Sequence, residues 1–140
     1  MIGTLPVRIY YEDTDAGGVV YYANYLKYLE RGRTEFIRAL GVEQRELARE
    51  TGLAFAVRSL SAEFLKPAVL DDELVVTTAV EALGRAQVSF TQTIERAKGN
   101  IFETLLTATV RVACLDLAKG RATAMPRPLH DKLKLLNPST

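Results

Sequence analysis

Residues 22–40, YANYLKYLERGRTEFIRAL, decide the fold because they form one long segment whose apolar residues repeat with the period of a helix. The apolar side of this helix is formed by Leu26, Leu29, Phe36, Ile37 and Leu40. Gly41 follows directly and is well placed to end the helix. Gly32 lies on or near the apolar side, where a glycine costs about 1 kcal/mol relative to alanine. We therefore expect the helix to lie tight against a sheet at Gly32.

Patterns typical of β-strands flank this helix. Before it, apolar and polar residues alternate over residues 4–11. After it, a short helix at residues 43–51 leads into further strand-like segments, at residues 53–64, 74–83, 88–94 and 106–114. Short turns join these segments, and strands joined by short turns pair in the antiparallel sense. We predict an α+β protein with the hotdog fold, in which an antiparallel β-sheet wraps around one long central α-helix.

Length and composition indicate one folded domain. A chain of 140 residues has the size of an ordinary domain. Its 48% hydrophobic and 25% charged residues are typical of globular proteins and unlike the composition of disordered chains. We predict a single domain over residues 1–128 and a polar C-terminal tail over residues 129–140.

The charge balance and the sequence ends exclude several classes of partner. Eighteen basic residues stand against seventeen acidic ones, which leaves no global field for nucleic acid or an anionic membrane. No apolar run is long enough to span a bilayer, and residues 1–6 lack the features of a signal peptide. We expect a cytoplasmic protein with no stable membrane insertion. One cysteine, Cys114, and one histidine, His130, are too few for the common zinc ligand sets, so no metal site is expected.

A candidate site lies where the loop at residues 12–18, EDTDAGG, meets the start of the long helix. The N–H groups and positive dipole end of a helix can stabilise negative charge on a reacting oxygen. The Asp15 carboxylate could attack an acyl carbon directly, or act as a general base for a water that does. Taken alone, such a loop is more often a turn whose carboxylates bond their own backbone.

Other polar residues near this junction have simpler expected roles. Asp13 is expected to hold the loop by hydrogen bonds, and Asn24 to cap the helix. Several charged residues of the helix are expected to form a solvated or interface face: Glu30, Arg31, Arg33 and Arg38.

The run at residues 11–21, YEDTDAGGVVY, followed by Asn24-Tyr25, resembles the signature of hotdog acyl-CoA thioesterases of the 4-hydroxybenzoyl-CoA thioesterase class, specifically the YbgC type. Further segments match in the expected order, at residues 55–58, 66–68 with 70–72, 90–92 and 112–114. The resemblance covers roughly residues 7–128, so it implies a hotdog thioesterase domain over the whole of that region.

The resemblance implies a hydrolase that cleaves the thioester bond of acyl-CoA, or of an acyl carrier protein, to a free acid and a thiol. It implies that Asp15 is the catalytic carboxylate and that the backbone N–H of Tyr22 polarises the thioester oxygen. Position 22 is commonly histidine in this type. A phenol is a poor substitute for an imidazole in proton transfer at neutral pH. We therefore expect an active enzyme that is slower than its relatives.

The remaining site residues also follow from the resemblance. Gly17, Gly18 and Val19 are expected to lie beside the substrate, and Arg85 to bind the CoA phosphates, although relatives cluster several basic residues there and this chain offers only Arg85. The resemblance implies no metal and no organic cofactor. It implies a homodimer or homotetramer, assembled through the sheets, with sites at subunit interfaces.

Two alternatives remain at this point. A hydratase or dehydratase on the same scaffold generally needs a histidine, and the only histidine, His130, lies in the expected tail. A non-catalytic binding or scaffold protein is the stronger alternative, because the YbgC resemblance carries a connection to the Tol-Pal envelope system. Envelope-system proteins, lipid-synthesis proteins and acyl carrier protein are the partners to consider.

Overall fold

The computed structural model describes residues 3–137. The α-helices in this range are α1 (Tyr22–Ala39), α2 (Gln44–Thr51) and α3 (Arg127–Leu136). The helices predicted at residues 22–40 and 43–51 are therefore confirmed with almost unchanged bounds. No helix in the described range is both long enough and apolar enough to cross a bilayer.

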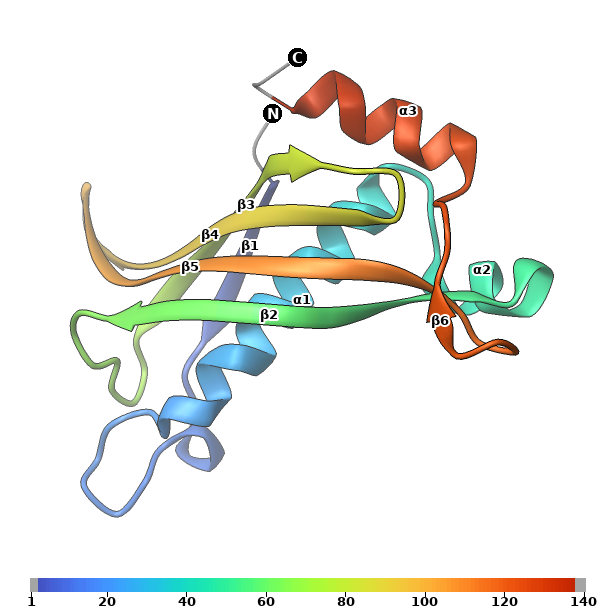
Figure 1. Cartoon of the computed structure of the whole chain (residues 1–140). Helices are drawn as coiled ribbons and strands as arrows, with labels where there is room; N and C mark the ends of the chain where they lie inside the picture. Colours follow the sequence, from blue (N-terminus) through green and yellow to red (C-terminus); the bar gives the residue numbers. More distant parts are fainter. Residues whose placement is uncertain (1–2, 138–140) are drawn as a thin grey trace.

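The strands form one antiparallel sheet that curls around α1 (Figure 1). They are β1 (Gly3–Arg8), β2 (Leu53–Phe64), β3 (Glu73–Leu83), β4 (Gln87–Lys98), β5 (Ile101–Asp116) and β6 (Arg121–Ala122). Their order in the sheet is β1-β3-β4-β5-β2, and the short β6 pairs with β5. This arrangement confirms the predicted antiparallel sheet wrapped around one long helix.

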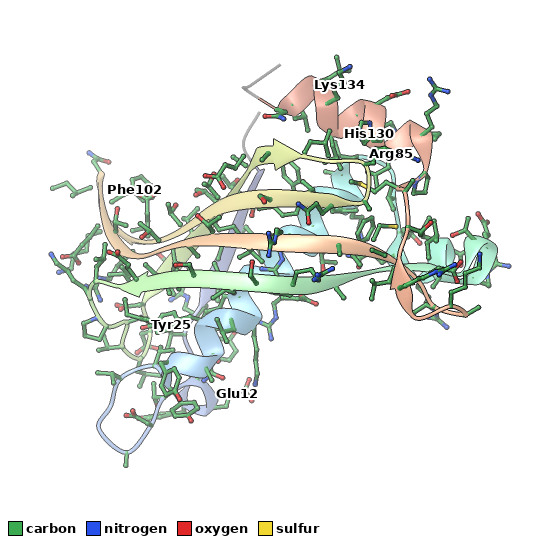
Figure 2. All side chains as sticks on the ribbon, in the orientation of Figure 1. Glu12, Tyr25, Arg85, Phe102, His130 and Lys134 are labelled. Atoms are coloured by element: carbon green, nitrogen blue, oxygen red, sulfur yellow. The ribbon has the colours of Figure 1, made fainter. Side chains whose placement is uncertain are left out.

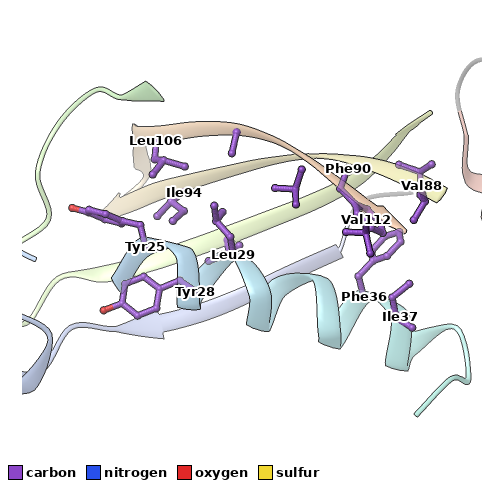
Figure 3. Packing of buried hydrophobic residues seen from close by; sticks show 14 of the residues in the cluster. Tyr25, Tyr28, Leu29, Phe36, Ile37, Val88, Phe90, Ile94, Leu106 and Val112 are labelled. Carbon is purple, nitrogen blue, oxygen red and sulfur yellow. The ribbon is translucent and has the colours of Figure 1, made fainter. Parts of the chain in front are cut away.

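The helix α1 packs chiefly against β1 and β3. A Cβ atom added to Gly32 would lie 2.8 Å from Val76 Cγ1 and 3.1 Å from Thr78 Oγ1, so only glycine allows this approach. The predicted tight contact at Gly32 is confirmed. Figure 3 shows the same face of α1, with Phe36 packed edge-on against Phe90 at a ring distance of 5.8 Å. The core therefore lies between α1 and the concave side of the sheet.

The first strand is shorter than predicted. The pattern at residues 4–11 predicted a strand to Tyr11, but β1 ends at Arg8. Tyr11–Asp13 instead forms the short 3-10 helix η1. The carboxylate of Asp13 accepts a hydrogen bond from the N–H of Tyr10 at 2.8 Å, and this local bond favours a turn over an extended chain.

The polar tail predicted over residues 129–140 is wrong for its described part. Residues 127–136 form α3, which begins with a proline in its first turn. Leu129 and Leu133, one helical turn apart, are buried in the core. A four-residue spacing is typical of a helix with one apolar side. The polar residues around these two leucines made the segment resemble a polar tail. Residues 138–140 lie outside the described residues.

Candidate active site

The loop before α1 is held in place through Asp13. Beyond the bond from its side chain to Tyr10, the carbonyl oxygen of Asp13 accepts the N–H of Tyr21 at 3.0 Å and the Nδ2 of Asn24 at 2.8 Å. These contacts support the structural role predicted for Asp13. The capping role predicted for Asn24 is wrong, because its side chain ties α1 to the loop and the capping position is Tyr21.

Asp15 lies in the exposed turn that follows. Its Oδ1 accepts the N–H of Gly17 at 2.8 Å and the N–H of Val19 at 3.4 Å. Gly18 closes the turn with φ of +83°, a conformation that favours glycine. Within the described residues, Oδ2 of Asp15 takes part in no hydrogen bond. One oxygen therefore shapes the turn, while the other is available to a ligand or a water.

The N-terminus of α1 carries no side-chain cap. The capping residue Tyr21 makes no side-chain hydrogen bond to the helix. The first N–H groups of a helix have no partner within it, and here Asn24 N donates back to Tyr21 O at 2.9 Å. Tyr22, the first helical residue, is exposed. The role predicted for its backbone N–H, which is to stabilise negative charge, stays a prediction.

An apolar cleft of about 270 Å³ opens between the start of α1 and the end of β2. It is lined by Val20, Tyr22, Tyr25, Phe64, Leu65, Lys66 and Pro67. The rings of Tyr22 and Tyr25 lie 6.3 and 5.7 Å from that of Phe64. The predicted residue Tyr22 thus belongs to the cleft, whereas Asp15, Gly17, Gly18 and Val19 do not line it. They form the neighbouring loop, which joins the cleft through the pairing of Thr14 with Val20.

The wall of this cleft opposite α1 is fixed by hydrogen bonds to residues 67–69. The buried Tyr25 hydroxyl accepts the N–H of Ala68 at 3.0 Å, and Ala68 O accepts the N–H of Val20 at 2.9 Å. Val69 pairs with Val19 in an isolated bridge. The segment at 67–69 is therefore the element that holds the loop of Asp15 from its other side.

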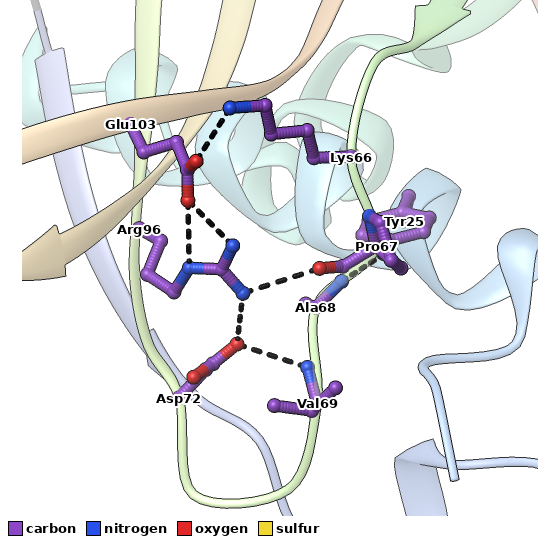
Figure 4. A network of polar contacts seen from close by, with 8 residues as sticks. All are labelled: Tyr25, Lys66, Pro67, Ala68, Val69, Asp72, Arg96 and Glu103. Atoms are coloured by element: carbon purple, nitrogen blue, oxygen red, sulfur yellow. Dashed lines mark hydrogen bonds and ion pairs between the residues drawn. The ribbon is translucent and has the colours of Figure 1, made fainter.

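An ion-pair network supports that segment (Figure 4). Arg96 Nη1 donates to Pro67 O at 3.1 Å and to Asp72 Oδ2 at 2.7 Å, and Arg96 Nε donates to Glu103 at 3.2 Å. Lys66 donates to the other oxygen of Glu103 at 2.6 Å. The hydrogen bonds from Lys66 and Arg96 lower the pKa of Glu103 to about 2. Arg96 was not singled out from the sequence, since its partners lie up to 29 residues away.

Arg85 lies in a different part of the molecule. It is exposed in the turn between β3 and β4, and together with α3 it borders a cleft of about 440 Å³. Arg127 and Lys134 of α3 line the same cleft together with His130 and the acidic Asp131, so more basic residues gather here than the sequence predicted. Figure 2 shows Arg85, His130 and Lys134 together at one end of the molecule and Glu12 at the other. Within one chain, Arg85 and the loop of Asp15 are not neighbours.

Two further predictions concern buried groups. Arg33, expected on a solvated or interface face, is only 9% exposed and donates from Nη1 to Gln92 Oε1 at 3.0 Å. Gln92 in turn donates to Leu29 O and Thr78 Oγ1, both at 2.9 Å. The sequence signal for this pair was Gln92, a polar residue at a core-facing position of a strand. Cys114 is buried, which raises the pKa of its thiol, in keeping with an inert role.

No group of three or more metal-ligating side chains (His, Cys, Asp or Glu) comes together within residues 3–137. A carboxylate turn at an uncapped helix end, with an apolar cleft beside it, has the chemistry needed to bind an acyl group and polarise its carbonyl. A curled antiparallel sheet around one helix, with this junction at the helix tip, defines the hotdog class of folds.

Comparison with known proteins agrees with this class. Residues 17–103 match the thioesterase superfamily. The chain is 46% identical over 126 residues to the acyl-CoA thioesterase YbgC of Haemophilus influenzae, covering 89% of this chain and 88% of that protein. It is 41% identical over 129 residues to the acyl-CoA thioester hydrolase YbgC of Escherichia coli O157:H7, covering 92% and 93%. The chain therefore belongs to the thioesterase superfamily.

A solved structure shares the whole architecture. A probable thioesterase from Bartonella henselae superimposes with a TM-score of 0.81 at 34% identity, covering 90% of this chain and 100% of that chain. The hotdog fold predicted from the sequence is confirmed.

Proposed function

We propose that the protein hydrolyses the thioester bond of acyl-CoA to a free acid and a thiol. The observation that carries this proposal is the free Oδ2 of Asp15 in a turn that leads directly into the uncapped N-terminus of α1. The apolar cleft beside Tyr22 offers a place for the acyl group. The names of the YbgC relatives support the same reaction.

The chemistry follows from two opposed groups. The backbone N–H of Tyr22 stabilises the negative charge that develops on the thioester oxygen. Asp15 either attacks the acyl carbon, giving an anhydride that water then hydrolyses, or removes a proton from an attacking water. In both routes the thiolate leaves and takes up a proton. Gly17 and Val19 donate their N–H groups to Oδ1 of Asp15, while the N–H of Gly18 donates to the main-chain oxygen of Asp15, so the turn orients the carboxylate.

We place the CoA phosphates in the basic cleft at Arg85. Arg127 and Lys134 add positive charge beside it, and guanidinium groups suit phosphate oxygens. The Arg85 cleft and the loop that contains Glu12 and Asp15 lie at different ends of the protomer (Figure 2), so we propose that one CoA binds the Arg85 cleft of one subunit and the Asp15 loop of another. The proposal therefore includes a homodimer or homotetramer. The free edge of β2 supports such an assembly.

Further partners and the compartment are also proposals. An acyl carrier protein could present the same thioester, since the reacting group is identical. We place the protein in the cytoplasm, where CoA thioesters are made. A role beside the envelope system is an addition to catalysis and not a substitute for it.

A panel of acyl-CoAs tests the proposal. The purified protein is mixed with short, long and aromatic acyl-CoAs, and free thiol is followed by a colour reagent. We expect release above background from at least one member. Asp15→Asn, purified in the same way, controls for contaminating thioesterases. Background release from every member at high enzyme concentration would remove the proposal and favour a binding or scaffold role.

A further inference from the structure

The sheet leaves one apolar row uncovered beside α1. Val57, Leu60 and Phe64 of β2 each lie opposite a buried core residue of β5, so they point to the same concave side as the helix. They are nevertheless 49%, 37% and 50% exposed, because α1 packs chiefly on β1 and β3. We call this apolar row of β2 beside α1, with a cleft at each of its two ends, the α1–β2 groove.

The groove starts at the candidate active site. Phe64 and Tyr22, at one end, line the cleft beside the loop of Asp15. Because β2 runs antiparallel to its partner β5 and begins just after α2, its first residues lie near the far end of α1 (Figure 1). The groove thus leads from the reacting group toward the C-terminal half of the helix.

A second cleft of about 130 Å³ lies at that far end. Apolar side chains make most of its wall, among them Ile37, Phe55 and Val57. The polar part of the wall consists of Glu30, Arg33 and Thr34 of α1 and Gln44 of α2. The most enclosed part of the groove therefore contains a buried cation.

Within the described residues, the charge of Arg33 is offset only by the nearby charge of Glu30, with which it forms no ion pair. Its only hydrogen bond within residues 3–137 goes to the neutral amide of Gln92, and it forms no ion pair with a carboxylate there. A guanidinium has five N–H donors, so most of them are unused. Burial lowers the pKa of Arg33, while the charge of Glu30 acts in the opposite direction. A buried charge without a hydrogen-bonded counter-charge is costly, and an anion that reached it would be held strongly.

The position of Arg33 sets the length of such a ligand. Arg33 follows Tyr22 by eleven residues, which is close to three whole helical turns, so both face the same side of α1 about 16 Å apart. An extended chain advances by roughly 1.2 Å per covalent bond. The distance therefore corresponds to an acyl chain of roughly 12 to 14 carbons.

We infer that the acyl chain of the substrate lies in the α1–β2 groove and that Arg33 binds a carboxylate at its far end. The preferred substrates are then CoA monothioesters of long dicarboxylic acids. Glu30 also borders the cleft and repels an anion, but it is exposed, so water and salt screen its charge. The inference rests on the proposed thioesterase function and names its substrate class.

The test compares matched substrates with the wild-type protein. Tetradecanedioyl-CoA and tetradecanoyl-CoA differ only in the terminal carboxylate, and both are used below their micelle-forming concentrations. We expect kcat/KM to be about tenfold or more higher for the dicarboxylic substrate, as a charge-assisted hydrogen bond provides. Hexanedioyl-CoA, whose chain is too short to reach Arg33, should gain nothing over hexanoyl-CoA.

Variants locate the effect at Arg33. Arg33→Gln should abolish the preference, whereas Arg31→Gln, an exposed cation on the same helix, should keep it. If Arg33 were merely structural, Arg33→Gln would lower kcat/KM equally for both substrates and the preference would persist. Should Arg33→Gln fail to fold, competition with the wild-type enzyme decides. Free tetradecanedioic acid should inhibit about tenfold more strongly than tetradecanoic acid.

Each outcome has a distinct meaning. Equal kcat/KM for the two long substrates with the wild-type protein would overturn the assignment of Arg33 and leave thioester hydrolysis standing. Thiol release from none of the substrates would overturn the proposed function itself.

Discussion

Asp13 and Asp15 lie two residues apart in one loop, but the structure uses their carboxylates differently. Asp13 is partly buried, and its side chain and carbonyl oxygen bind Tyr10, Tyr21 and Asn24. Asp15 is exposed, and only its Oδ1 is engaged, within its own turn. The difference separates a carboxylate that holds the loop from one that can act on a ligand.

Replacing Asp15 should have the largest effect on activity. Asp15→Asn keeps an oxygen that can accept the N–H of Gly17 but removes the nucleophile or base. We expect kcat to fall about 10²- to 10⁴-fold, with a free energy of unfolding within about 0.5 kcal/mol of the wild type. Thiol-release kinetics and urea unfolding measure the two quantities. Retention of most activity would move the catalytic role away from Asp15.

The wall that faces the Asp15 loop should be the next most sensitive element. Arg96→Gln removes the pairs to Asp72 and Glu103 and the bond to Pro67 O. We expect the free energy of unfolding to fall by about 1–2 kcal/mol and KM to rise more than kcat falls, since residues 67–69 shift. Arg8→Gln, which breaks an exposed ion pair with Glu73, is the matched control and should cost less than about 1 kcal/mol.

The same network predicts a pH dependence. Lys66 and Arg96 depress the pKa of Glu103 to about 2 in the folded protein, below its value of about 4.5 in the unfolded chain. The contribution of Glu103 to stability is therefore present above about pH 4.5 and is lost as the pH falls toward 2. Urea unfolding can be followed between about pH 3 and pH 6. Over this range the free energy of unfolding should fall less on acidification for Arg96→Gln than for the wild type. Parallel curves for both proteins would refute this role of Glu103.

Replacing Asp13 should sharpen the contrast between the two carboxylates. Asp13→Ala loses the acceptor for Tyr10 N and should lower the free energy of unfolding by about 1 kcal/mol. The fall in kcat should be smaller than for Asp15→Asn, because Asp13 acts only by holding the loop in place. Glu12→Ala, an exposed neighbour, should stay within about 0.5 kcal/mol. A loss of kcat as large as that of Asp15→Asn, in a stably folded protein, would make Asp13 a second catalytic carboxylate.

Tyr22 should show the smallest effect. The proposal uses its backbone N–H, so Tyr22→Phe should change kcat by less than about threefold. The aromatic ring that packs near Phe64 is retained in this variant, and only the hydroxyl is removed. A loss of about tenfold or more in kcat would instead give the hydroxyl a part in proton transfer.

Local sequence patterns were enough to predict the main architecture. The three- and four-residue spacing predicted α1, and alternation predicted the strands because one face of each strand meets the core. The glycine at position 32 predicted the close approach to Val76. The helix α3 escaped prediction, because Leu129 and Leu133 stand among polar residues and become part of a core only once the sheet is in place.

The candidate site was predictable only in part. The loop of Asp15 and the helix tip at Tyr22 are neighbours in sequence, so their adjacency was predictable, whereas their catalytic roles stay predictions. The network of Arg96 and the pair of Arg33 with Gln92 join residues from different elements, and they meet only through the strand register and the packing of α1 on the sheet. The position of Arg85 illustrates the same limit, since sequence order does not reveal which end of the helix it reaches.

The most direct test is a structure of Asp15→Asn with an intact acyl-CoA bound. The account predicts that the thioester oxygen lies within about 2.7–3.2 Å of a backbone N–H in the first turn of α1. The side chain of residue 15 should lie within about 3–3.5 Å of the acyl carbon, or of a water positioned to attack it. A thioester bound with its carbonyl away from the helix tip, or beyond the reach of residue 15 and such a water, would contradict the account.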